Sequence, residues 1–133
     1  MENTPETVLS QYERKNIDLL NQLIEKTLDG KIKWRKVPSG IFASIPGVLQ
    51  MNFVAALSPR PPFLAMFAPE AWESFSVSDH QGNLLTEIQN QGVIPSVVSG
   101  KADLLFAVTK LFNLVITQII GELDKAITLV REI

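Results

Sequence analysis

Residues 72–89 read Trp72-Glu-Ser-Phe-Ser-Val-Ser-Asp-His-Gln-Gly-Asn-Leu-Leu-Thr-Glu-Ile-Gln89, and this stretch decides the class of fold. From Trp72 to Ser78, large apolar residues alternate with serine, which is the period of a strand that buries one face. Residues 79–83 suit a hairpin loop in which Gly82 supplies a positive φ. Residues 84–89 then form the return strand. The stretch therefore predicts an antiparallel hairpin.

Further extended segments precede this hairpin. Within the hairpin itself, Phe75 and Val77 are expected to point inward and the serines outward. Upstream, strands are predicted at residues 31–37, 41–45 and 48–57, the last with Leu49, Met51, Phe53 and Ala55 on one face. Three prolines between Ser58 and Pro62 exclude a ladder there and predict a loop. Residues 63–68 form a possible strand that is apolar on both sides.

Helices are predicted at both ends of the chain. The first begins with Thr4 as N-cap and Pro5 at the first helical position, where its missing N–H costs nothing. It ends before Gly30, a favourable residue just past a helix end. A long helix is predicted from Lys101 to the end, following a loop over residues 91–100. Its polar residues trace one narrow stripe: Lys110, Asn113, Thr117, Gly121, Asp124 and Thr128.

The order helix, sheet, helix predicts an α+β fold. We expect an N-terminal helix, an antiparallel β-meander of four to five strands, and a long C-terminal helix packed on one face of the sheet. Parallel βαβ units are disfavoured because no helix lies between the strands. No repeat or linker divides the chain, so residues 1–133 are expected to form a single α+β domain.

The composition of the chain argues against several classes of function. Its 133 residues carry a net charge of −2, which gives no general attraction to nucleic acid or anionic membrane. The absence of cysteine excludes disulfides, zinc–thiolate sites and a cysteine nucleophile, and fits a cytoplasmic protein. The acidic N-terminus is no secretory signal. The apolar stretch 104–123 is interrupted by Lys110, Asn113, Gln118 and Glu122, so no membrane span is expected.

Charge is depleted in the middle of the chain, where Arg60 is the only charged residue between Val37 and Pro69. A half-solvated antiparallel sheet should alternate apolar with polar residues. Three interpretations stay open: a sheet covered on both faces within the domain, an interface with a partner, or a pocket for a small apolar ligand. The residues predicted to bind a partner are Arg60, Phe63, Met66 and Phe67.

The length of the C-terminal helix is a second signal. Residues 101–133 would form a rod of about 50 Å at 1.5 Å per residue, whereas a domain of this size is roughly 36 Å across. The helix must break near Gly121, fray near Ile133, or extend beyond the domain and pack on a second copy. Apolar residues cover most of the circumference of this helix, which favours extension and packing on a second copy. We therefore expect a homodimer through this helix or through the apolar sheet region.

No known catalytic or cofactor motif is present. Lys31, Lys33, Arg35 and Lys36 surround Trp34, which suits either a single-stranded nucleic acid or an edge strand protected by charge; the overall acidity favours the edge strand. His80 and the alternating serines lack catalytic partners. Residues 96–101 are similar to the end of a phosphate-binding loop, but the first glycine of that motif would fall at position 95, which is Pro95. No catalytic, cofactor-binding or metal-ligating residue is therefore assigned.

The chain resembles a group of small bacterial proteins with a helix–meander–helix layout. The resemblance rests on residues 20–34, ending Thr27-Leu-Asp-Gly-Lys-Ile-Lys-Trp34, on residues 75–88, and on the closing helix around Leu111 and residues 123–127. It implies the same fold and carries no activity, and the proline-rich middle departs from it.

From these signals the expected function is that of a small non-catalytic protein acting through protein–protein contacts and self-association. The alternative is a small apolar-ligand-binding domain with a pocket between the sheet and the C-terminal helix. A hydrolase of unfamiliar type would need His80 or a carboxylate in a cleft.

Overall fold

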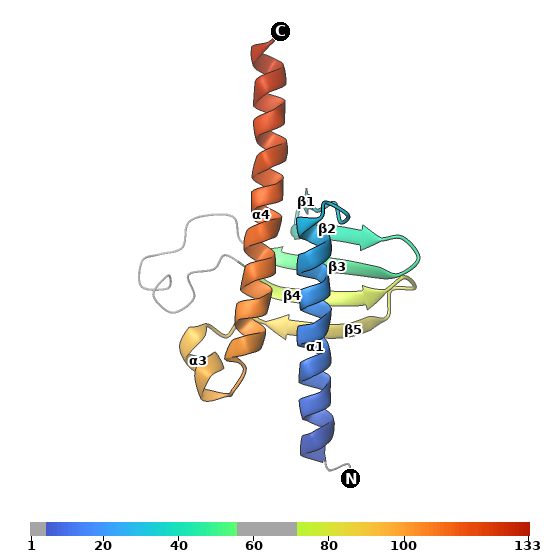
Figure 1. Ribbon diagram of the computed structural model, residues 1–133, viewed down its shortest axis with the longest axis vertical. Coiled ribbons are helices and arrows are strands. Elements are labelled where there is room, and N and C mark those ends of the chain that lie inside the picture. The colour runs from blue at the N-terminus through green and yellow to red at the C-terminus, as the bar shows by residue number, and fades with distance from the viewer. Residues whose placement is uncertain (1–4, 56–71) are drawn as a thin grey trace.

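Eight helices and strands are found in the computed structural model, which describes residues 5–55 and 72–133 of the chain. In chain order they are α1 (Pro5–Leu28), β1 (Arg35–Val37), β2 (Gly40–Ile45), β3 (Leu49–Ala55), β4 (Trp72–Asp79), β5 (Leu84–Gln89), the short α3 (Val93–Val98) and the long α4 (Ala102–Arg131). The five strands form one antiparallel meander in the order β1-β2-β3-β4-β5 (Figure 1). The predicted α+β fold is confirmed.

The helix α1 begins at Pro5, the residue predicted for its first position. At its other end, the Gly30 N–H donates to the Thr27 carbonyl at 3.1 Å and the Lys31 N–H donates to the Lys26 carbonyl at 2.9 Å. Gly30 has a φ of 73°, which glycine adopts without the steric cost of a side chain. These bonds end the helix and turn the chain toward the sheet.

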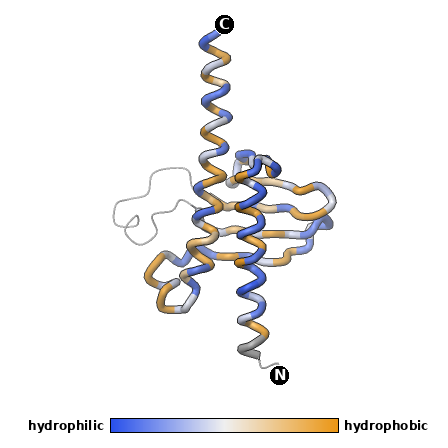
Figure 2. The backbone as a smooth tube through the Cα atoms, viewed as in Figure 1, coloured by the Kyte–Doolittle hydropathy of each residue, from blue (hydrophilic) through white to orange (hydrophobic). Residues whose placement is uncertain are grey.

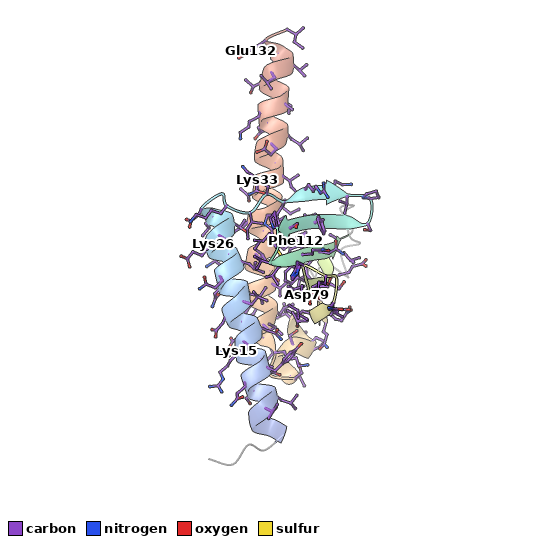
Figure 3. All side chains as sticks on the ribbon, turned by 90° about the vertical axis from the view of Figure 1, so that its right-hand side faces the viewer. Lys15, Lys26, Lys33, Asp79, Phe112 and Glu132 are labelled. Atoms are coloured by element: carbon purple, nitrogen blue, oxygen red, sulfur yellow. The ribbon has the colours of Figure 1, made fainter. Side chains whose placement is uncertain are left out.

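Aromatic side chains form the centre of the core. Phe53 of β3 is fully buried, and its ring lies 4.5 Å from that of Phe75 and 5.3 Å from that of Phe112, centroid to centroid. The rings of Trp34 and Trp72 lie 5.7 and 6.5 Å away. The predicted inward faces of β3 and β4 are therefore correct. Figure 3 shows Phe112 between α4 and the sheet, which joins the two layers.

Both long helices lie on the same face of the sheet, with α1 beside α4 (Figures 1 and 3). The opposite face carries no helix in the described part of the chain. Its residues on β2, β3 and β4 are mainly uncharged and polar: Ser44, Gln50, Asn52, Ser74, Ser76 and Ser78. The outward-facing serines of β4 are as predicted, and Gln50 and Asn52 of β3 lie on the same face.

Residues 91–100 were expected to be a loop, but they contain α3. Gly92 has a φ of 86° at its start, and the Ser96 N–H donates to the Gly92 carbonyl at 3.2 Å. Pro95 lies in the first turn, where a helix needs no N–H from it. A helix of six residues is too short for its apolar period to appear in the sequence.

The predicted loop at Ser58–Pro62, the possible strand at residues 63–68, and the predicted contact residues Arg60, Phe63, Met66 and Phe67 lie outside the described residues.

The C-terminal helix is continuous and extends beyond the sheet (Figures 1 and 2). The helix α4 has 30 residues and passes through Gly121 without a break. At 1.5 Å per residue it is about 45 Å long. Its buried residues end at Val115, and from Glu122 onward every residue is exposed. Of the three outcomes considered for this helix, the structure has the extension.

Candidate interaction sites

The helix α4 leaves the domain beside the segment that leads into β1. There the side-chain amide of Gln118 accepts the backbone N–H of Trp34 at 2.8 Å and donates to the carbonyl of Ile32 at 3.0 Å. The Trp34 indole N–H donates to the Thr27 hydroxyl at 3.0 Å. These bonds join α4, the segment before β1 and the end of α1. They therefore fix the position of α4 at the point where it leaves the domain.

Beyond that point, residues 120–131 form what we call the free segment. The stripe that packs in the core, from Leu105 to Val115, continues through Ile119, Leu123, Ile127 and Val130 at intervals of three and four residues, with Ile120 beside it. In the free segment the exposed fractions are 52% for Ile120, 59% for Leu123, 48% for Ile127 and 67% for Val130. The described part of the chain therefore leaves a continued core stripe uncovered over about three turns.

Apart from Ala126 and the exposed Leu129, the rest of the free segment has no large apolar side chain and carries mixed charge. Lys125 and Glu122 form an exposed ion pair at 3.3 Å. Asp124 and Arg131 add one charge of each sign, and Glu132 follows (Figure 3). Alternating charge of this kind is typical of the solvated side of a helix whose other side meets a partner helix.

By length and composition alone, α4 is long and apolar enough to cross a membrane. Its first half, however, packs in the core: Leu105, Val108, Leu111 and Val115 are buried. The core helix of a soluble protein passes the same test, so this property is weak evidence for a membrane span.

A second surface lies at the far edge of the sheet, and we call it the edge groove. It has a volume of about 290 Å³ and is lined by α1 from Leu9 to Asn16, by β5 from Glu87 to Gln89, by Ser96 and by the start of α4 around Leu104. Asn16 and Ser96 are buried, with exposed fractions of 8% and 4%. Neither side chain makes a hydrogen bond to another described side chain or to described backbone.

The edge groove lies close to the predicted alternative, a pocket between the sheet and the C-terminal helix. Its volume of about 290 Å³ is just under the range of small-molecule pockets, about 300–1,000 Å³. Its lining mixes leucine with Glu13, Glu87 and Lys101, and contains no phenylalanine. The sequence pattern does not predict this groove. The available signal was Asn16, an amide within the otherwise apolar stripe of α1.

The basic segment before β1 has the arrangement expected of a protected edge strand. Ile32 and Trp34 are buried, whereas the side chains of Lys31, Lys33 and Arg35 are exposed. The guanidinium carbon of Arg35 lies 5.2 Å from the centre of the Phe42 ring. Because β1 is the first strand of the sheet, these charges flank an edge that no other strand within residues 5–55 and 72–133 covers.

The hairpin between β4 and β5 carries His80 at its exposed tip. There Asp79 accepts the backbone N–H groups of Gln81 and Asn83, both at 2.9 Å, and the Asn83 side-chain amide at 3.1 Å. The bonds from Asn83, followed by those from Gln81 and the charge of His80, lower the pKa of Asp79 below its usual 3.8. The arrangement stabilises a turn and brings no nucleophile to His80.

Within residues 5–55 and 72–133, no cluster of three or more histidine, aspartate or glutamate side chains is placed to hold a metal ion. No protein-family model matches the chain. No curated protein and no solved structure matches it either.

Proposed function

We propose that this protein acts through protein–protein contacts and that it self-associates through the free segment of α4, without catalysis. The observation that carries the proposal is the core stripe of α4, which continues past the sheet with its apolar side chains about half exposed or more. Exposed apolar surface of this extent usually marks a contact site.

A second copy of the chain suits the free segment better than a membrane surface. Helices that lie on anionic membranes carry mainly lysine and arginine on their polar face. Here the free segment carries two acidic residues, Glu122 and Asp124, and two basic ones, Lys125 and Arg131, and Glu132 directly after it makes the helix end net negative. Its net negative charge would be repelled by such a membrane. The free segment is also much shorter than the roughly 20 residues of a membrane span.

The surface beside the N-terminal end of the free segment is suited to bind a second copy. A notch of about 310 Å³ is lined by Trp34, Ile119 and Leu123 and by three charged residues, Arg35, Lys36 and Glu122. In an antiparallel pair of free segments that cross at Lys125, Glu132 of each copy is level with Gln118 of the other, since each lies seven residues from the crossing. The Glu132 carboxylate then approaches a notch whose lining carries two basic residues and one acidic residue, a net positive charge that is complementary to it.

The test compares two neighbouring substitutions in sedimentation velocity at tens of micromolar. Ile127→Lys places a charge on the stripe, and Thr128→Lys places the same charge one residue away on the polar side. We expect the wild type and Thr128→Lys to sediment as a dimer and Ile127→Lys as a monomer. Because Ile127 is half exposed in one copy, its substitution should leave the protomer folded by circular dichroism. A monomeric wild type overturns the proposal.

A further inference from the structure

The edge groove adjoins a strand whose outer edge has no neighbour in the described residues, because β5 is the last strand of the sheet. The Asn90 N–H donates to the Glu73 carbonyl at 2.9 Å, and Phe75 lies opposite Ile88 in the same register. In an antiparallel pair, alternate residues exchange hydrogen bonds with the partner strand. Ile88 and Asn90 therefore face β4, and Glu87 and Gln89 direct their backbone N–H and C=O groups outward.

Those outward groups are unpaired in the described part of the chain and lie in the groove. In this register the backbone groups of Glu87 and Gln89 take no part in the β4 ladder, neither residue makes another backbone hydrogen bond to a described residue, and both line the groove. One step along the strand, Tyr12 donates to the Thr86 hydroxyl at 2.9 Å. Tyr12 thus closes the groove at one end, while the edge remains open at Glu87 and Gln89.

The helix layer extends past this edge. The N-terminal part of α1 continues below β5 (Figure 1), with Val8, Leu9 and Tyr12 at least half exposed. On the other side, α3 exposes Ile94 and Val97. The helix layer therefore extends past β5, and among the described residues no strand lies beneath the apolar side chains at this end.

From these observations we propose that the edge groove binds an extended peptide segment of a partner protein, which adds a sixth strand beside β5. Glu87 and Gln89 supply two donor–acceptor pairs at the two-residue repeat of a strand. The amide of Asn16 supplies a further donor and acceptor at the buried wall. Peptide side chains on the helix side would meet Leu9 and Leu104, which favours apolar residues at alternate positions.

The occupant is inferred to be a peptide because the groove offers backbone complementarity. Asn16 is more than nine-tenths buried without a described partner, and a buried amide left unpaired is costly. A purely apolar ligand would leave that amide and the two strand edges unsatisfied. The proposal is independent of self-association, since the free segment lies at the opposite end of α4.

The test selects displayed random heptapeptides on the full-length protein and synthesises the enriched sequences. We expect binding in the micromolar range that falls about tenfold in Asn16→Ala, because two hydrogen bonds are lost. The exposed residue Asn21→Ala on the same helix is the matched control and should bind as the wild type. Two versions of the peptide, N-methylated at the odd or at the even positions, should then be compared. One version should lose binding and the other should keep it, because only alternate peptide N–H groups face β5.

Amide hydrogen exchange gives a direct measurement of the strand edge. In the free protein, Glu87 and Gln89 should exchange fast while Ile88 is protected, and bound peptide should slow Glu87 and Gln89 about tenfold or more. Ile127→Lys is expected to be monomeric. If bound peptide slows the exchange of Glu87 and Gln89 to the same extent in this variant, the protection does not come from self-association. Failure to enrich any peptide overturns the proposal, as does binding that leaves both amides fast. Protection that is already present without peptide and disappears on dilution would assign the edge to a second copy instead.

Discussion

The side chain of Gln118 on α4 accepts the backbone N–H of Trp34 at 2.8 Å, although 84 positions separate the two residues in the sequence. The same amide donates to Ile32 at 3.0 Å, so it pairs with this segment as a neighbouring strand would. Through this contact the long helix is attached where it leaves the domain, and the direction of the free segment is set by the sheet.

The first prediction concerns this contact. Gln118→Leu leaves the Trp34 N–H and the Ile32 carbonyl without a partner in a partly buried site, which should cost about 1–3 kcal/mol in the free energy of unfolding. Gln118→Glu keeps the acceptor for Trp34 and loses only the bond to Ile32, so its cost should be smaller. Urea unfolding followed by tryptophan fluorescence measures both. Equal stability of Gln118→Leu and the wild type would contradict this role.

The second prediction concerns Gly40, where β2 passes close to β3. A Cβ atom at this position would lie 1.8 Å from the carbonyl oxygen of Phe53, which is backbone and cannot move aside. Gly40→Ala should therefore destabilise the fold by about 3 kcal/mol or more, at the upper end of overpacking costs.

A glycine-to-alanine substitution in α4 should have the opposite effect on the free energy of unfolding. Gly121 is helical and a Cβ atom there meets nothing within 4 Å, so Gly121→Ala should stabilise the chain by up to about 1 kcal/mol. Thermal unfolding of the two variants gives the comparison. Tolerance of Gly40→Ala would show that β2 and β3 are further apart than described.

The third prediction is a dependence on pH at the β4–β5 hairpin. Because hydrogen bonds from Asn83 and Gln81 hold the pKa of Asp79 below 3.8, its contribution to stability is present above the unfolded pKa. That contribution is lost as the pH falls through the lowered folded pKa. An NMR titration of the Asp79 carboxyl should give a midpoint below 3.8, and Asp79→Asn should remove this part of the acid dependence. A midpoint at or above that value would exclude the turn geometry.

Much of the fold could be predicted because local patterns and tertiary structure agree. The serine alternation of β4, the Gly82 turn and the proline at the start of α1 each act within a few residues, and the structure places them as expected. The short helix α3 could not be predicted in this way, since one and a half turns contain no readable period. The outward serines of β4 were predicted from their alternation, whereas the depletion of charge between Val37 and Pro69 left open whether the rest of that face is covered.

The candidate sites also differ in how far the sequence could predict them. The extension of α4 was one of three outcomes that its length allowed, and choosing among them required the position of the sheet relative to Val115. The edge groove depends on which strand is last in the sheet and which backbone groups face outward there. Those relations join α1, β5 and α4, which are far apart in the chain, so no local pattern encodes them.

The fourth prediction, and the most direct test of self-association, is a distance between two copies. The chain contains no cysteine, so Lys125→Cys introduces a single site for a nitroxide label on the polar side of the free segment. Packed helix axes lie only about 8–10 Å apart, so we predict a resolved dipolar distance between labels in pulsed electron resonance at tens of micromolar. That distance should disappear when Ile127→Lys is added. A featureless decay in the otherwise unchanged protein, with a sedimentation mass of one chain, would contradict the account.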